Sequence, residues 1–137
     1  MTTPTPIIEL VRRLYATLAT GDAAALPGLL APDFDGWLAE GLPPGIGGHH
    51  HGVDAIRDHG WWAIGRACRL RTEPSAWIGC DDGRLLVLGR YSGTVRSTGA
   101  AVDARFAHLW TARDGRLTAL WHLTDTARWG VAHGESA

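Results

Sequence analysis

The spacing of apolar residues changes near residue 70, and this change constrains the fold more than any other feature of the sequence. Before it, apolar residues recur every three or four positions, as in an amphipathic helix; after it, they alternate with polar residues, as in a strand with one buried face. Glycine-containing turns separate the alternating segments. Helices followed by an antiparallel meander predict an α+β fold, in which helices cover one face of a curved sheet. The predicted strands are Leu70–Cys80, Arg84–Val95, Ala101–Arg113 and Arg116–Thr126.

We expect three helices ahead of these strands. The first covers residues 5–20, between a proline and a glycine; the second covers residues 23–31, and the third residues 53–67. Residues 33–52 lie between the second and third helices and contain six glycines and two prolines. This composition predicts a long loop, which in a compact domain often has a functional role.

Length and composition favour one domain without a nucleic-acid partner. The 137 residues are 45% hydrophobic, which suffices for one core, so we expect a single domain over residues 1–137 with an ordered part over about residues 6–130. The net charge of -1 gives no basic surface for nucleic acid or an anionic membrane. Two cysteines without metal or redox spacing, and the lack of a secretory signal or a long apolar run, predict a cytoplasmic protein.

Three polar residues lie on apolar rows of the predicted strands. Alternation places His108 on an aromatic row and Tyr91 on an apolar row of the preceding strand, while Asp125 ends a row that includes Trp121 and Leu123. If the three rows face one side, an imidazole, a phenol and a carboxylate share an apolar pocket. An imidazole and a partly buried carboxylate titrate in the range that suits general acid–base catalysis.

Each of these residues also has a structural interpretation. A histidine on an apolar face is often a core residue satisfied by a neighbouring acceptor, which would explain His108. Asp125 precedes a short helical pattern and can cap it, and Tyr91 can line a wall with its hydroxyl in solvent. The sequence leaves these interpretations open beside the catalytic one.

The run His49–His51 predicts no metal site, because adjacent residues of a flexible loop rarely point at one ion. We expect His50 to border the mouth of the pocket instead, and metal-assisted chemistry through the run is a third possibility. The sequence has no nucleophile elbow, phosphate-binding loop or dinucleotide fingerprint, so no cofactor is predicted.

The layout resembles the nuclear transport factor 2-like superfamily, also called the ketosteroid isomerase-like or SnoaL-like fold. The resemblance is carried by "LYATLATGDAAALPGLLAPDF", "GVDAIRDHGWW" and "RFAHLWTARDGRLTALWHLTDTARW". It implies a cone-shaped fold, a strongly bent sheet around a pocket closed by helices, and a homodimer formed through the outer face of the sheet. In SnoaL-like polyketide cyclases, an acid at the position of Asp125 is catalytic.

Other members of the superfamily fit less well. Steroid isomerases have a tyrosine on the first helix where this chain has Leu14, with Tyr15 one step aside, and their base has only loosely placed counterparts here. The epoxide hydrolases pair an arginine with an acid, whereas this chain has Arg90 followed by Ser92. The cyclase pattern therefore fits best.

We hypothesise a cofactor-free isomerase or cyclase that transfers a proton on a small hydrophobic carbonyl compound, polyketide-like or steroid-like. Asp125 would move the proton, while His108 or Tyr91 would stabilise the developing enolate. The alternative is a module of the same fold that binds a small ligand or a protein without catalysis. The residues expected to contact substrate are Trp37, His50, Trp62, Phe106, Trp110 and Trp121.

Overall fold

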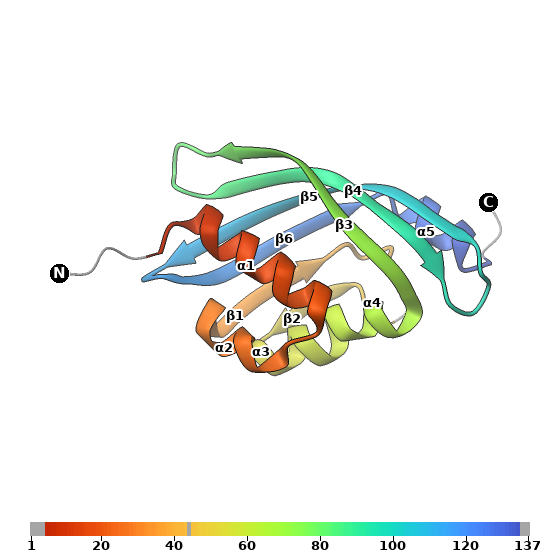
Figure 1. Cartoon of the computed structure of the whole chain (residues 1–137), viewed down its shortest axis with the longest axis horizontal. Helices are drawn as coiled ribbons and strands as arrows, with labels where there is room; N and C mark the ends of the chain where they lie inside the picture. The colour runs from red at the N-terminus through yellow and green to blue at the C-terminus, as the bar shows by residue number, and fades with distance from the viewer. Residues whose placement is uncertain (1–4, 44, 135–137) are drawn as a thin grey trace.

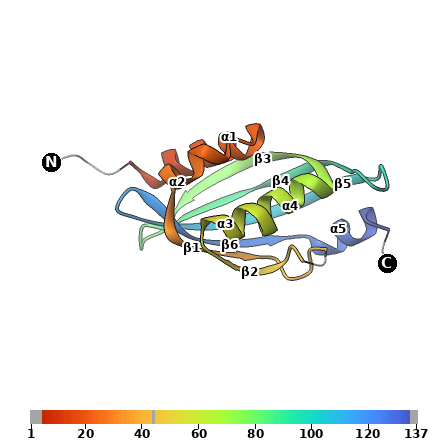
Figure 2. The same cartoon turned by 90° about the horizontal axis from the view of Figure 1, so that it is seen from below.

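Six strands form one mixed sheet in this computed structural model, which describes residues 5–43 and 45–134. The strands lie in the order β2-β1-β6-β5-β4-β3, and the sheet curves around helices on one of its faces (Figures 1 and 2). β1 runs parallel to β6, and every other neighbouring pair is antiparallel. The predicted α+β class is confirmed. The bounds are β1 Leu30–Leu38, β2 Gly48–His51, β3 Cys68–Gly79, β4 Leu85–Val95, β5 Ala101–Arg113 and β6 Arg116–Thr124.

The helices follow the predicted order, with one added at the C-terminal end. The third predicted helix is a continuous helical segment whose middle turn, Ile56–Trp61, has the wider π-helical geometry. No helix within the two described ranges combines the length and the apolar character that a membrane span requires. The bounds are α1 Ile7–Thr20, a 3-10 turn Ala23–Ala25, α2 Leu26–Leu29, α3 Val53–Ala55, α4 Trp62–Ala67 and α5 Thr126–Ala132.

The apolar face of α1 packs against the sheet. Leu10, Val11 and Leu14 are buried, as the helical spacing predicts. The helix ends at Gly21, whose φ of 73° is left-handed and whose N–H donates to the Thr17 carbonyl. This packing holds α1 over β5 and β6 (Figures 1 and 2).

The long loop predicted over residues 33–52 is wrong in large part, because β1 and β2 occupy much of it as an antiparallel pair. Phe34, Gly36 and Leu38 alternate on the buried face of β1. A Cβ atom at Gly36 would lie 2.6 Å from the Ile56 side chain, so this glycine permits close packing against the helical layer. Its presence made a buried strand resemble a loop.

A β-bulge in β6 reverses the faces that alternation assigned to the last strand. Thr111 pairs with Ala119 and Ala112 with Leu117, so one residue of β6 has no partner on β5. Leu117 is buried as expected, but beyond the bulge Trp121 is 56% and Leu123 63% exposed. The buried residues there are Leu120 and His122, which uninterrupted alternation from Leu117 would place on the opposite face.

Candidate functional site

Two tyrosines and two histidines form a continuous hydrogen-bond chain between α1 and the sheet. The Tyr15 oxygen lies 2.7 Å from His108 Nδ1, and the Tyr91 oxygen lies 2.6 Å from His108 Nε2. The Tyr91 oxygen also lies 3.0 Å from His122 Nε2. At the far end, the backbone N–H of Ala39 donates to His122 Nδ1 across 3.2 Å. We call Tyr15, His108, Tyr91 and His122 the Tyr–His chain.

Three neighbouring strands and α1 position these four residues. Tyr91 lies on β4, His108 on β5 and His122 on β6, all on the face that the helices cover. His108 and His122 are directly opposite each other in the β5–β6 pairing. Tyr15 reaches the sheet from α1, where it is only partly buried. One end of the chain is therefore deep in the core and the other lies near the surface.

The hydrogen positions of the chain follow from one donor. Because the Ala39 N–H donates to Nδ1 of His122, a neutral His122 carries its hydrogen on Nε2 and donates it to the Tyr91 oxygen. Tyr91 then donates its O–H to Nε2 of His108, which leaves the His108 hydrogen on Nδ1 for donation to the Tyr15 oxygen. All the hydrogen bonds thus point from the core towards Tyr15.

The Tyr15 oxygen accepts two hydrogen bonds and keeps its own hydrogen free. It accepts from His108 Nδ1 and, across 3.3 Å, from the indole N–H of Trp110. Among the residues that the structure describes, none accepts the Tyr15 O–H. This hydroxyl is consequently a donor held in place by two fixed partners, on a side chain that is only partly buried.

Burial keeps all four side chains of the Tyr–His chain uncharged at neutral pH. Desolvation lowers the pKa of His122 to about 4, and desolvation, together with the nearby His122, holds the pKa of His108 well below its usual value. Desolvation also raises the pKa of Tyr91 and of Tyr15 above the ordinary value for a phenol. Both imidazoles are therefore neutral and both phenols protonated, which agrees with the hydrogen positions above.

Aromatic rings enclose the chain. Phe106 stacks on His108, with ring centroids 4.1 Å apart and planes 22° apart, and the Trp129 ring meets Tyr91 edge-on at 5.6 Å. Trp110 meets His108 edge-on at 6.0 Å while bonding to Tyr15. These contacts exclude water from the two histidines and fix their ring orientations.

Some of the predicted site residues meet here and others do not. His108, Tyr91, Phe106 and Trp110 lie together on the buried face, as alternation predicts. Asp125 does not share this face: its side chain is 48% exposed and pairs with Arg128 at 3.4 Å. It precedes α5 at the N-cap position without a capping side-chain bond. The expectation that Asp125 lines the same pocket is wrong, because the bulge in β6 displaces it.

The predicted substrate-binding residues divide in the same way. Trp37 and Trp121 are exposed on the outer face of the sheet, where they stack with centroids 5.6 Å apart, so their expected place in the pocket is wrong. Trp62 is half-buried against the core from α4. His50 is buried, and its Nε2 lies 2.6 Å from the Ile46 carbonyl. Contact of Trp62 or His50 with a substrate stays a prediction.

Sequence reasoning missed two members of the chain. His122 was assigned to the wrong face because the bulge has no sequence signature, although a second histidine one strand away from His108 was a usable signal. The register of α1 places Tyr15 one position beside the tyrosine of the steroid isomerases, yet its side chain reaches His108. A tyrosine beside the apolar face of a helix can still reach the core, since its side chain is long enough to extend past the neighbouring apolar residues.

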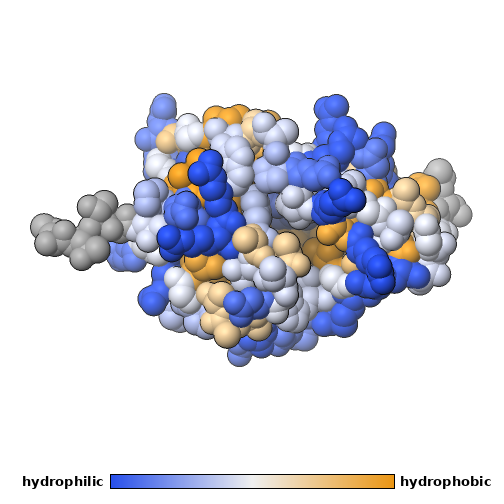
Figure 3. All heavy atoms as spheres, in the orientation of Figure 1, coloured by the Kyte–Doolittle hydropathy of each residue, from blue (hydrophilic) through white to orange (hydrophobic). Residues whose placement is uncertain are grey.

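The described part of the chain has several surface hollows. Figure 3 shows a recess beside α1 with hydrophobic side chains on its walls. A separate shallow hollow of about 780 Å³ lies on the outer face of the sheet, lined in part by Leu88, Ala107 and Leu123. None of the Tyr–His chain residues lines that outer hollow. A ligand that accepts the Tyr15 O–H would have to approach from the α1 side.

The bent sheet, its helical layer and its buried polar residues define a nuclear transport factor 2-like protein. A match to the SnoaL-like domain family covers residues 11–120, and the chain belongs to this family. No functionally curated protein matches the sequence.

Solved structures agree with this assignment. An NTF2-like protein from Burkholderia thailandensis is 27% identical and superposes with a TM-score of 0.82 over 97% of this chain and 98% of its own. TerC, co-crystallised with polyporic acid, is 27% identical with a TM-score of 0.81 over 93% of this chain and 98% of its own. A "putative polyketide cyclase" from Sinorhizobium meliloti, 24% identical over 84% of this chain and 94% of its own, has a TM-score of 0.68 and shows the shared fold.

Proposed function

We propose that the protein is an isomerase or cyclase that stabilises the enolate of a small hydrophobic carbonyl compound through the Tyr15 hydroxyl. The free Tyr15 O–H, held by His108 and Trp110, is the observation that carries the proposal. A hydrogen bond to a carbonyl oxygen strengthens as negative charge develops there, so a fixed donor accelerates enolisation. Isomerisation, cyclisation and elimination next to a carbonyl all pass through this intermediate.

The Tyr–His chain acts by holding and polarising Tyr15, and it does not deliver a proton from its far end. Nδ1 of His122 accepts from a backbone N–H, which cannot release its hydrogen. If every hydrogen of the chain moved one step towards Tyr15, His122 would become an imidazolate, which the buried site does not stabilise. The hydrogen bonds instead align along one direction and polarise one another, which strengthens the last donor.

The Tyr–His chain does not supply the base that removes the substrate proton. Asp125 keeps the family position of a catalytic acid or base, but its exposed side chain pairs with Arg128 and does not reach the Tyr–His chain. His108 accepts from Tyr91 at Nε2, so neither of its nitrogens is free to accept a proton. Asp125 is therefore tested independently of Tyr15, by its own variant in the same experiment.

Two similarities support a carbonyl substrate. The family is SnoaL-like, and TerC, at 27% identity, was co-crystallised with polyporic acid. The inner face of the sheet is aromatic, which suits a flat hydrophobic molecule with one polar oxygen.

The test uses proton NMR in D2O to monitor hydrogen–deuterium exchange of the weakly acidic α C–H groups in a panel of small aryl ketones. The protein should accelerate exchange of at least one compound, and Tyr15→Phe should reduce the acceleration about a hundredfold. Asp125→Asn separates the two assignments, since loss of a positioned acid or base costs about a hundredfold or more. Equal rates for wild type and Tyr15→Phe on an accelerated ketone would contradict the assignment of Tyr15.

A non-catalytic binding module is the second candidate, and the lowered pKa of His108 and of His122 favours it. Neither histidine titrates near neutral pH, so the Tyr–His chain lacks the near-neutral pKa that is typical of a general base. Ligand binding without exchange of any α C–H would favour this candidate. Tyr15→Phe should then weaken affinity, because the Tyr15 O–H bond to the ligand is lost.

A further inference from the structure

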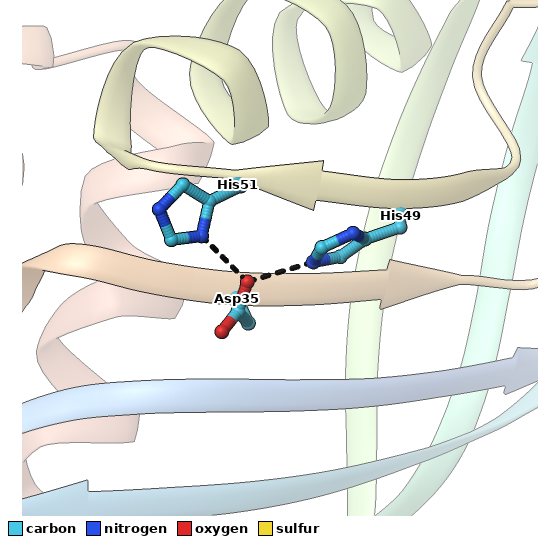
Figure 4. A group of neighbouring side chains, drawn as sticks. All are labelled: Asp35, His49 and His51. Carbon is cyan, nitrogen blue, oxygen red and sulfur yellow. Dashed lines mark hydrogen bonds and ion pairs between the residues drawn. The ribbon is translucent and has the colours of Figure 1, made fainter.

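Asp35, His49 and His51 form a cluster on the outer face of the sheet, away from the Tyr–His chain. His49 Nε2 and His51 Nδ1 each lie 2.7 Å from Asp35 Oδ1 (Figure 4). The three side chains offer one ligand atom each, all within 4.8 Å of one another. The prediction of no metal site rested on a flexible loop, and the run His49–His51 is instead part of strand β2.

Strand geometry explains why these residues converge. His49 and His51 are two positions apart on β2, so their side chains leave the same face, while His50 between them points into the core. Asp35 lies directly opposite His51 on the neighbouring strand β1. An edge hairpin thus presents two imidazoles and a carboxylate to one point.

We propose that Asp35, His49 and His51 bind a zinc ion at the edge of the sheet. Zinc prefers nitrogen and carboxylate ligands at about 2.0–2.2 Å, so ligand atoms around a tetrahedral ion lie about 3.3 Å apart. The present separations reach this geometry through small side-chain rotations. Two imidazoles among three ligands favour zinc over magnesium or calcium, which take oxygen ligands. Three protein ligands leave a fourth position for water or another ligand.

The surroundings pre-arrange the site. The Trp37 ring stacks on His49 with centroids 3.9 Å apart and planes 11° apart, which fixes that imidazole. The side chains of His49 and Asp35 are about two-fifths exposed, so an ion can reach them from solvent.

A zinc ion bound here would link β2 to β1 and would thereby affect the Tyr–His chain indirectly. Ala39, directly after β1, supplies the N–H that fixes the hydrogen position of His122. Ile46, shortly before β2, has its carbonyl 2.6 Å from His50 Nε2. A bound ion would therefore restrain the two strands beside Ala39 and Ile46, and with them the deep end of the Tyr–His chain.

The experiment titrates untagged, chelator-treated protein with zinc chloride by calorimetry, and with cobalt chloride by visible absorption. We expect one ion per chain and the d–d bands of a tetrahedral cobalt site. Asp35→Asn, His49→Gln and His51→Gln should each weaken zinc binding about tenfold or more. The matched control is His59→Gln, since His59 is an exposed histidine outside the cluster and should leave affinity unchanged.

Circular dichroism of each metal-free variant checks that it is folded. These substitutions are on the surface, so the variants should keep the wild-type thermal midpoint without zinc. Two results would overturn the proposal: no zinc binding to folded wild-type protein, or equal affinity in wild type and all three ligand variants. The second result would assign the bound ion to some other part of the surface.

Discussion

The Tyr91 hydroxyl donates to Nε2 of His108 across 2.6 Å, inside a core where the Phe106 and Trp129 rings pack against Tyr91. The same oxygen accepts from His122 at 3.0 Å. One phenol thus satisfies two buried imidazoles and determines which nitrogen of His108 carries hydrogen. The direction of the whole Tyr–His chain, and with it the free O–H of Tyr15, depends on this residue.

Replacing Tyr91 with phenylalanine should therefore destabilise the protein. Tyr91→Phe leaves one nitrogen of His108 and one N–H of His122 buried without a partner, and each unsatisfied group costs about 1–3 kcal/mol. Urea unfolding monitored by tryptophan fluorescence gives the change in the free energy of unfolding. Asp125→Asn is the control and should change it by less than about 0.5 kcal/mol, because that side chain is exposed.

Stability should fall as the pH drops below the ordinary histidine range. Folding lowers the pKa of His122 from 6.5 to about 4, and it also holds the pKa of His108 well below 6.5. Between these values the unfolded protein binds protons that the native protein does not. The contribution of the buried histidines to the free energy of unfolding is therefore fully present above pH 6.5 and is lost as the pH falls towards 4. The slope reaches about 1.4 kcal/mol per pH unit for each histidine.

Urea unfolding at a series of pH values between these limits measures that slope. His122→Gln removes one of the two titrating groups and should reduce the slope by about half. His59→Gln should leave it unchanged, because His59 is exposed. A wild-type free energy of unfolding that stays constant across this interval would show that the two histidines are not held neutral. The lowered pKa of Asp35 acts below 3.8 and does not interfere.

Alternation predicted the strands from β3 to β6 and the burial of Tyr91 and His108, because β4 and β5 pair without a register shift and keep a strict period of two. The turn after β5 illustrates this: Asp114 and Gly115 have φ values of 53° and 77°, which their sequence favours. For these strands and turns, the residues of each segment were enough to predict its secondary structure.

The predictions from sequence were wrong where the structure depends on contacts between residues that are far apart in the sequence. Gly36 is required by the approach of Ile56, which no nearby residue reveals, so β1 resembled a loop. The bulge in β6 arises from its pairing with β5, and one extra residue was enough to exchange the faces of Trp121 and His122. For this reason the sequence placed His108 in the site but selected Asp125 as its partner instead of His122.

The absence of a side chain at Gly89 gives a further prediction. A Cβ atom there would lie 2.4 Å from the Glu73 carbonyl oxygen and 2.5 Å from the Phe106 ring. Gly89→Ala should therefore displace Phe106, which stacks on His108, and destabilise the fold by about 1–3 kcal/mol. Gly65→Ala is the matched control: nothing lies within 4 Å of that position in α4, so it should stabilise the helix by up to about 1 kcal/mol.

Thermal unfolding compares the two glycine variants directly. Proton NMR adds a second readout, since displacement of Phe106 changes the ring current at His108. If Gly89→Ala matched wild type in thermal midpoint and in the His108 resonances, the close packing of Phe106 on β4 would be disproved.

An apolar ladder crosses the outer face of the sheet and predicts self-association. Each member is paired with the next across neighbouring strands from β1 to β3, and several are exposed. Monomeric proteins rarely expose such a continuous apolar surface, so we expect a homodimer formed through it. The ladder consists of Trp37, Trp121, Leu109, Leu86 and Ile78.

A charge within this ladder should separate the two copies. Trp121→Glu places a carboxylate where the partner's apolar side chains would pack, and burying an unpaired charge is strongly unfavourable. Sedimentation velocity should show a dimer for wild type and a monomer for this variant. Val131→Glu introduces the same charge at an exposed valine on α5, away from the ladder, and should remain dimeric. A monomeric wild type, or a Trp121→Glu variant that stays dimeric, would exclude this face as the interface.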